Sequence, residues 1–384
     1  MVNSIDFRSK FPQQGASIFS KMTRLAREHN AINLAQGYPN YDCDQALKDC
    51  VNSYIEQGYN QYAPMQGSEF LRTEISHLIE ASYDFSIDPN LITLTAGATQ
   101  AIFTAIQVLV KQGDEVIVID PSYDSYKPSI RAAGGTPISY QIPLPNLTVD
   151  WNELGSLISE KTTMIIINTP HNPTGMMLSK EDLDSLYTLI QDTQITVLSD
   201  EVYEYLTYDS VKHYSVLQHD GLRERSIATY SFGKMLHCTG WKIGYAIAPE
   251  WITQELRKLH QFVTFCVNTP MQYGIANYLK HHKERVKGLG QFYQAKKELL
   301  ESGLQNSRLQ PLPTAGTYYK LYRYDSISNQ SDIDFTLDVI KSHGVALLPI
   351  SVFSDKPSDG HYVRICFAKT EDTLTQACER LCQL

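Results

Sequence analysis

Between residues 91 and 200, short apolar segments alternate with segments of helical periodicity. The apolar segments have the length of buried strands, and each ends in turn-forming or polar residues; they cover 92–95, 115–119, 164–167 and 195–198. The segments 100–111 and 180–191 predict helices between strands. Near-continuous apolar strands separated by helices are typical of a sheet that is covered on both faces. The pattern therefore predicts an α/β fold built on a mostly parallel sheet.

The two ends of the chain show a different pattern. Helical spacing predicts one helix at 15–29 and a long helical section over about 250–303. After this section, short strands and helices alternate, with strands predicted at 315–322 and 361–368 and helices at 332–341 and 371–381. A chain of 384 residues is long enough to form two lobes. We therefore predict a large domain over 46–285 and a smaller α+β domain formed by 286–384 and an N-terminal arm, 1–45.

Charge and cysteine content argue against several classes of protein. The formal net charge of −9 disfavours a general surface for nucleic acid or anionic membranes. The N-terminus has no basic segment followed by an apolar one, and no apolar run approaches membrane length. The seven cysteines have no framework spacing, and no histidine or second cysteine pair accompanies Cys378 and Cys382 to form a metal site. We therefore predict a cytoplasmic protein with free thiols and no metal centre.

The segment 226–249 places a lysine at the edge of the protein interior. Two apolar runs, 226–230 and 241–248, predict strands, and the turn Ser231-Phe232-Gly233-Lys234 lies between them. Burial disfavours a charged lysine, so the pKa of Lys234 is expected to fall and its amine to become nucleophilic. Such an amine suits the formation of a covalent bond to a carbonyl group. The alternative is a turn lysine whose amine reaches solvent.

Other polar residues follow the carboxyl ends of the predicted strands, where ligands bind in open α/β sheets. Asn172, Asp200 and Tyr203 lie at such ends together with Lys234. The small residues Gly97-Ala98-Thr99 open a predicted helix, whose N-terminal N–H groups can bind an anion. Ser231 and Lys242 could add a hydroxyl group and a cation. An amine, a carboxylate and a phosphate cradle in one crevice fit pyridoxal phosphate.

These residues belong to motifs whose order and spacing resemble a known family. The motifs are Asn172-Pro173-Thr174-Gly175, Asp200-Glu201-Val202-Tyr203, Ser231-Phe232-Gly233-Lys234 with Gly240-Trp241-Lys242-Ile243-Gly244, and Val363-Arg364-Ile365-Cys366-Phe367-Ala368. Together they make the chain similar, over essentially its whole length, to class I aminotransferases of the fold-type I pyridoxal-phosphate enzymes. The resemblance implies a large domain with a seven-stranded, mostly parallel sheet, a smaller α+β domain and bound pyridoxal 5'-phosphate.

The resemblance implies a catalytic or cofactor-binding role for the residues at the ring. Lys234 would hold the cofactor covalently and move the proton between substrate and cofactor. Asp200 would pair with the pyridine nitrogen. Asn172 and Tyr203 would hydrogen-bond the 3-oxygen of the ring, and Tyr123 would stack on it. Lys234, Asp200 and Tyr203 are accordingly the predicted catalytic residues.

Further matching residues would bind the charged groups of cofactor and substrate. The predicted phosphate ligands are Gly97, Ala98, Thr99, Ser231 and Lys242, with Tyr62 contributed by the neighbouring subunit of a homodimer. Arg364 would bind the substrate α-carboxylate in a bidentate pair, with Gly37 and Asn172 beside it. The family more often carries arginine at position 242, and lysine keeps the charge but loses the fork-shaped donor pair.

The segment 262–272 bears on the substrate. It is most like the branch of methionine, glutamine and kynurenine aminotransferases, and it contains no arginine that could bind a side-chain carboxylate. Asn268 stands where kynurenine-type relatives often carry histidine. Aromatic residues could line an apolar pocket instead, namely Phe19, Tyr38, Tyr62 and Phe265. We therefore predict transfer of the amino group of methionine or an aromatic amino acid to a 2-oxo acid by a ping-pong mechanism.

Two other functions stay open at this point. A β-elimination lyase for cysteine conjugates or cystathionine would use the same Lys234 and Asp200, and it would release pyruvate and ammonia without an acceptor. A cofactor-binding regulator without catalysis would need an added DNA-binding domain, for which the chain leaves no room before the arm helix. Single residues also allow purely structural interpretations: Asp200 as a helix N-cap, Arg364 on an edge strand and Tyr123 in the core.

Overall fold

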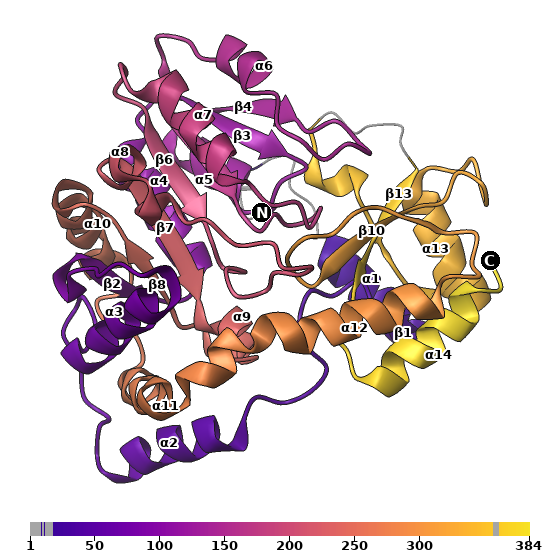
Figure 1. The fold of residues 1–384 in the computed structure, drawn as a ribbon, viewed down its shortest axis with the longest axis horizontal. Coiled ribbons are helices and arrows are strands. Elements are labelled where there is room, and N and C mark those ends of the chain that lie inside the picture. Colours follow the sequence, from indigo (N-terminus) through magenta and orange to yellow (C-terminus); the bar gives the residue numbers. More distant parts are fainter. Residues whose placement is uncertain (1–8, 10, 12–17, 356–360) are drawn as a thin grey trace, which may run out of the picture.

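A computed structural model of the protein describes residues 9, 11, 18–355 and 361–384 (Figure 1). Its largest sheet has seven strands in the order β2-β8-β7-β6-β5-β3-β4. Only β8 runs antiparallel to both of its neighbours, and the other pairings are parallel. The predicted mostly parallel sheet is thereby confirmed. Its strands are β2 (Ile92–Thr95), β3 (Glu115–Asp120), β4 (Thr136–Gln141), β5 (Thr162–Asn168), β6 (Thr196–Asp200), β7 (Ser226–Ser231) and β8 (Gly244–Ile247).

Helices cover both faces of this sheet because successive side chains of its strands point to opposite sides. In β3, Val116 and Val118 enter one core, while Ile117 and Ile119 enter the other. The first core is closed by α4 (Ala98–Leu109), α5 (Tyr126–Ala133) and α10 (Glu250–Val263). The second includes residues of α3 (Glu69–Tyr83), α6 (Trp151–Ser156), α7 (Lys180–Ile190), α8 (Asp220–Arg223) and α11 (Thr269–Lys287). The helix α2 (Gln45–Glu56) packs on α11.

A second, smaller sheet lies in the C-terminal part of the chain. Its antiparallel order is β12 (Leu348–Pro349), β13 (Tyr362–Cys366), β10 (Tyr319–Arg323) and β9 (Gln310–Pro311). Helices α13 (Asp332–His343) and α14 (Glu371–Leu381) pack nearby, and Figure 1 shows α12 (Leu289–Gly303) running from beside α9 toward α14. The predicted strands and helices of a smaller α+β lobe are therefore present.

The N-terminal segment joins this C-terminal lobe. The strand β1 (Ile32–Asn33) pairs in parallel with β11 (Val345–Ala346), and α1 (Ile18–Glu28) also contacts β11. The first residues of the predicted helix, 15–17, lie outside the described residues. The arrangement agrees with an arm that completes the smaller lobe, while the exact division at 45/46 and 285/286 stays a prediction.

Three elements illustrate where the structure differs from the expected pattern. The strand predicted at 241–248 begins only at Gly244, because the 3₁₀ turn η3 (Thr239–Trp241) and the left-handed residue Lys242 (φ 55°) first reverse the chain. The helix α5 and the strand β4 were not indicated by the sequence pattern. Pro128 interrupts the periodicity of α5, and β4 is an edge strand with partly exposed side chains, so its apolar signal is weak.

Short helical turns connect the remaining elements: α9 (Phe232–Met235), η1 (Pro89–Leu91), η2 (Val216–Gln218) and η4 (Ser351–Phe353). In the part of the chain that the structure describes, every helix falls short of the length or apolarity needed to cross a membrane.

Candidate active site

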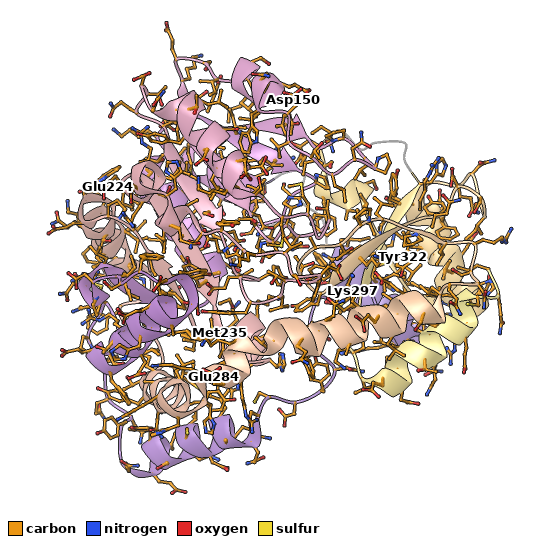
Figure 2. All side chains as sticks on the ribbon, in the orientation of Figure 1. Asp150, Glu224, Met235, Glu284, Lys297 and Tyr322 are labelled. Atoms are coloured by element: carbon orange, nitrogen blue, oxygen red, sulfur yellow. The ribbon has the colours of Figure 1, made fainter. Side chains whose placement is uncertain are left out.

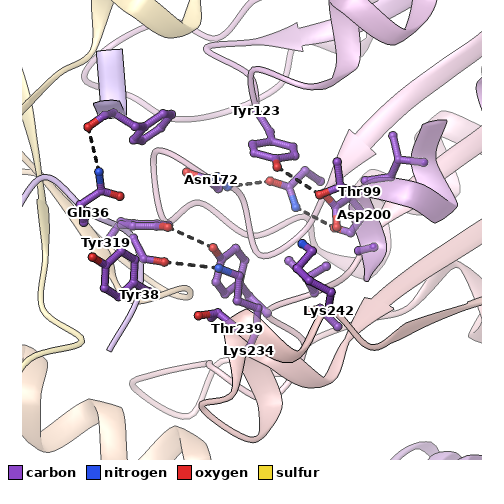
Figure 3. Close-up of a pocket in the computed structure, with 18 of the residues that line it drawn as sticks. Gln36, Tyr38, Thr99, Tyr123, Asn172, Asp200, Lys234, Thr239, Lys242 and Tyr319 are labelled. Atoms are coloured by element: carbon purple, nitrogen blue, oxygen red, sulfur yellow. Dashed lines mark hydrogen bonds between the residues drawn. The ribbon is translucent and has the colours of Figure 1, made fainter. Parts of the chain in front are cut away.

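One cavity lies between the carboxyl ends of the large sheet and the smaller sheet (Figure 3), and it contains about 890 Å³ of empty space including its open mouth. The large sheet contributes Asp200 and the short helix α9 contributes Lys234, whereas Arg364 comes from β13 of the smaller sheet. The cavity brings together most of the predicted site residues: Gly37, Ala98, Thr99, Tyr123, Asn172, Asp200, Tyr203, Ser231, Lys234, Lys242 and Arg364.

Lys234 projects from α9, directly after strand β7, and its amine ends inside the protein. The Nζ atom lies 2.7 Å from the hydroxyl group of Tyr318 and 3.3 Å from the carbonyl oxygen of Gly37. Burial lowers the pKa of Lys234 to about 8, and the positive charges of Lys242 and Arg364 act in the same direction. Lys234 therefore lines the cavity instead of extending from a surface turn, and a lowered pKa suits a nucleophilic amine.

Asp200 is the last residue of β6 and is buried. Its Oδ2 atom accepts a hydrogen bond from the hydroxyl group of Tyr126 at 2.5 Å, while Oδ1 is buried without a partner among the described residues. Burial raises the pKa of Asp200 to about 6, against the lowering effect of the Tyr126 hydrogen bond and the charge of Lys234. Because turns rather than a helix follow Asp200, the N-cap interpretation is wrong. A buried, unpaired carboxylate oxygen fits a cationic ring N–H donor.

Arg364 lies in the interior of the smaller sheet, because β13 is flanked by β12 and β10. It is 1% exposed, so the interpretation as an edge-strand surface residue is wrong. Its Nη1 atom donates to Oδ1 of Asn172 at 2.7 Å, and its guanidinium carbon lies 3.8 Å from the ring centroid of Tyr319. Its Nε atom is buried without a partner among the described residues. The guanidinium group therefore retains a donor for an anionic ligand.

The N-terminus of α4 provides the predicted anion cradle. Gly97 has a positive φ of 78°, and a Cβ atom there would lie 3.2 Å from Nζ of Lys242. A Cβ at Gly244 would lie 2.8 Å from the backbone nitrogen of Ala98, so β8 passes directly beside this helix end. The amine of Lys242 and the first turn of α4, with Ala98 and Thr99 on the cavity wall, thus share one corner of the cavity, which suits a phosphate group.

Tyrosine side chains form much of the remaining wall. Tyr123 lines the cavity, and its hydroxyl group lies 3.2 Å from Oγ1 of Thr99, so it is not only a core residue. The hydroxyl group of Tyr203 donates to that of Tyr319 at 3.2 Å. Nζ of Lys234 lies 5.6 Å from the centroid of the Tyr203 ring. Aromatic faces on the cavity wall suit a flat ring ligand.

Tyr62, Phe265 and Asn268 lie outside the cavity of their own chain. Tyr62 is 81% exposed, and its ring contacts that of Phe265, with centroids 5.1 Å apart. Asn268 lines a separate surface depression next to Tyr62 and caps α11. Phe19 and Tyr38, in contrast, line the cavity as expected.

The structure also brings in residues that sequence reasoning missed. Gln36, Asn168, Thr239 and Tyr319 line the cavity, and Tyr126 holds Asp200. Asn168 ends β5, so the rule that ligands gather at strand ends could have found it. No comparable signal in the sequence marks the others. Within the described residues, no group of three or more histidine, cysteine, aspartate or glutamate side chains is placed to hold a metal ion.

Comparisons with known proteins agree with this site. A model of the family "Aminotransferase class I and II" matches residues 29–381. The methionine aminotransferase of Escherichia coli (strain K12) is 45% identical and covers 98% of this chain and of its own length. The aromatic-amino-acid aminotransferase 2 of Thermococcus litoralis is 31% identical over 91% of this chain and 90% of its own. A crystal structure from Escherichia coli, described with a methionine aminotransferase function, has a TM-score of 0.97 at 45% identity, with 98% of this chain and 99% of that chain covered.

The residues present fit the cofactor of this family. The activated lysine, the unpaired oxygen of Asp200 and the helix N-terminus beside Lys242 match the aldehyde, the ring nitrogen and the phosphate of pyridoxal phosphate. The family match spans nearly the whole chain, and the architecture is that of fold-type I. The chain therefore belongs to the class I and II aminotransferases and is a pyridoxal-phosphate-dependent transaminase.

Proposed function

We propose that the chain transfers the amino group of methionine or an aromatic amino acid to a 2-oxo acid, in two half-reactions that alternate at one site. The observation that carries this proposal is the cavity wall near Arg364. Arg364 is the only arginine among the described residues that line the cavity, and Phe19, Tyr38 and Tyr319 line the same cavity. A second substrate carboxylate would find no further bidentate partner there, whereas an apolar side chain would be accommodated. Two relatives are named for methionine and aromatic amino acids, which supports these donors.

The proposed roles follow from the contacts of each residue. Pyridoxal phosphate, when bound, supplies an aldehyde for the amino group and a ring that accepts electrons from the substrate Cα. Asp200 would pair through its free Oδ1 with the protonated ring nitrogen. Tyr203 and Asn172 would donate hydrogen bonds to the ring oxygen, and Tyr123 would lie against the ring face. Their positions on the cavity wall support these assignments.

Arg364 and Lys234 would act on the substrate itself. Arg364 would bind the α-carboxylate, and Asn172, which accepts from Nη1, would hold the guanidinium group in place. Because the pKa of Lys234 is about 8, its amine can both take up and return a proton near neutral pH. Gly97, Ala98, Thr99, Ser231 and Lys242 would bind the phosphate group. Burial of the cavity residues would keep water away from the reacting atoms.

Donor preference tests the proposed substrate class. With the cofactor-loaded protein and a fixed 2-oxo acid, we expect kcat/KM for methionine and phenylalanine to exceed that for aspartate by at least about 10²-fold, because the second carboxylate would be buried without a partner. Steady-state rates of oxo-acid formation measure this ratio. A preference for aspartate or glutamate would contradict the proposal. Release of pyruvate and ammonia from a cysteine conjugate without any acceptor would instead identify a lyase.

We also propose a homodimer in which Tyr62 of one copy reaches the phosphate site of the other. Tyr62, Phe262 and Phe265 are 81%, 83% and 46% exposed, and an aromatic surface of this kind supports a protein contact. Phe262→Asp is expected to shift the protein from dimer to monomer in analytical ultracentrifugation, because the interface would bury a charge. Ile333→Asp, on α13, is the matched control and should leave the dimer intact. A wild-type protein that sediments as a monomer at micromolar concentration would contradict the assignment.

A reducing compartment, such as the cytoplasm, is the proposed location. All seven cysteines lie among the described residues as free thiols, and Cys43, Cys238, Cys366 and Cys378 are buried. Free thiols are typical of proteins that work in a reducing environment.

A further inference from the structure

The amine of Lys234 also contacts Tyr318, a tyrosine that is not part of the cavity wall. Tyr318 precedes strand β10, and it is 0% exposed. Its ring packs between aromatic neighbours, with centroids 5.2 Å from Tyr203, 4.9 Å from Tyr319 and 5.7 Å from Tyr293. Burial raises the pKa of Tyr318 well above its usual value, so the phenol stays neutral. The ring is therefore fixed, and its hydroxyl group has a defined direction.

The hydroxyl group of Tyr318 connects two parts of the site. It donates its hydrogen to the carbonyl oxygen of Gly37 at 2.7 Å. With its proton used there, the oxygen can only accept from Nζ of Lys234, which lies 2.7 Å away. Nζ also donates to the carbonyl oxygen of Gly37 at 3.3 Å. The amine, the phenol and the carbonyl group thus form a closed triangle of hydrogen bonds.

We propose that Tyr318 is a positioning residue for Lys234. A neutral amine carries two hydrogens and one lone pair. In this triangle both hydrogens have an acceptor, so the lone pair is the one position left for an electrophile. The hydroxyl group of Tyr318 therefore orients the amine so that its lone pair can form a bond. The same oxygen also stabilises the protonated form of Lys234, because it accepts a hydrogen bond from the ammonium group.

The Gly37 carbonyl group can serve as an anchor because its loop is held on both sides. Nζ of Lys369 lies 3.2 Å from the carbonyl oxygen of Gln36 and 2.8 Å from that of Tyr38. Lys369 is buried, so these contacts are shielded from water. The same loop lines the substrate side of the cavity. Through its hydrogen bonds, Tyr318 thereby connects the amine of Lys234 to the 36–38 loop on the cavity wall.

Tyr318→Phe tests the proposal in the cofactor-free protein. Trace acetylation with acetic anhydride, followed by mass spectrometry of the peptide that contains Lys234, reports the fraction of neutral amine at each pH. In the wild type we expect a midpoint near pH 8, as the lowered pKa of Lys234 implies. In Tyr318→Phe the midpoint should fall by about one pH unit, because the ammonium form loses a hydrogen-bond acceptor.

A tyrosine on strand β10, four residues after Tyr318, offers a matched control. Tyr322 (labelled in Figure 2) is buried, and its hydroxyl group has no hydrogen-bond partner among the described residues. Tyr322→Phe removes an equivalent hydroxyl group and should leave the midpoint of Lys234 unchanged. Lys127, whose Nζ lies 2.5 Å from Oδ2 of Asp120, reports folding in the same samples, because it stays slow to react in a folded protein. If Tyr318→Phe does not fold, 3-fluorotyrosine at position 318 keeps the ring and weakens its hydroxyl group as an acceptor, so the midpoint of Lys234 should again fall.

The kinetics of the cofactor-loaded enzyme give a second readout. Tyr318→Phe should lower kcat by about tenfold and leave KM for the amino donor within about twofold, since it acts on the proton-transferring amine rather than on substrate binding. An unshifted midpoint in a folded variant would overturn the proposal, whatever the activity. The labelling experiment needs neither cofactor nor amino donor, so its outcome is independent of the proposed substrate.

Discussion

Lys234→Ala is expected to lower kcat for transamination by at least about 10⁴-fold, because it removes both the nucleophile and the proton-transferring group. The free amine of Lys234 lines the cavity, and its pKa is about 8. The variant should also no longer retain cofactor after treatment with borohydride, which the wild type retains as a covalent adduct. Single-turnover kinetics with methionine and mass spectrometry of the reduced protein measure the two effects.

An exposed lysine provides the control for this variant. Lys212 lies on the surface after Val211, away from the cavity. Lys212→Ala should keep the wild-type kcat and the covalent adduct. Lys234→Arg keeps the positive charge but cannot form the adduct, so it should be as inactive as Lys234→Ala. Substantial turnover in either Lys234 variant would overturn the assignment of this residue.

Arg364→Leu is expected to lower kcat/KM for amino acid donors by about 10²–10⁴-fold, because two charge-assisted hydrogen bonds to the α-carboxylate are lost. The loss should depend on the carboxylate of the substrate. For 3-(methylthio)propylamine, which is methionine without its carboxylate, Arg364→Leu and wild type should have similar kcat/KM values. Steady-state kinetics with both donors measure this difference.

The neighbouring strand supplies the matched control. Arg323 on β10 is exposed and pairs with Asp325, whereas Arg364 on β13 is buried. Arg323→Leu should therefore leave both donors unaffected. If Arg364→Leu slows the amine and the amino acid equally, the guanidinium group supports the fold of the cavity instead of binding the carboxylate. Thermal unfolding of both variants separates this effect from a loss of stability.

The sequence was informative where side-chain periodicity reflects burial. The strand predicted at 92–95 coincides with β2, and the helix predicted at 180–191 agrees with α7 to within one residue. Such elements are buried on one stripe or on both faces, so their apolar pattern is strong. The edge strand β4 and the proline-containing helix α5 lack this pattern. Their positions follow from pairing with β3 and packing on α4, which are tertiary contacts.

In the site, too, local sequence pattern identifies some residues, whereas others depend on tertiary contacts. Asn172, Asp200 and Lys234 could be predicted because each lies at or shortly after the carboxyl end of a strand that faces the cavity. The residues that form hydrogen bonds with Asp200 and Lys234 could not be predicted. Tyr126 and Tyr318 are two of 24 tyrosines, and nothing in their local sequence shows which hydroxyl group will meet Asp200 or Lys234. Those contacts depend on how separate elements pack.

The long-range contacts of the cavity have a consequence for synthesis on the ribosome. Asn172 and Arg364 are 192 positions apart, and Arg364 and Ala35 are 329 apart. A nascent chain that has already exposed all seven strands of the large sheet therefore still lacks Arg364, the residue proposed to bind the α-carboxylate. Such contacts also form slowly, because long loops must close first. Tyr318 and Arg364 both come from the C-terminal part of the chain, so the surroundings that lower the pKa of Lys234 are also complete only after this part has been made.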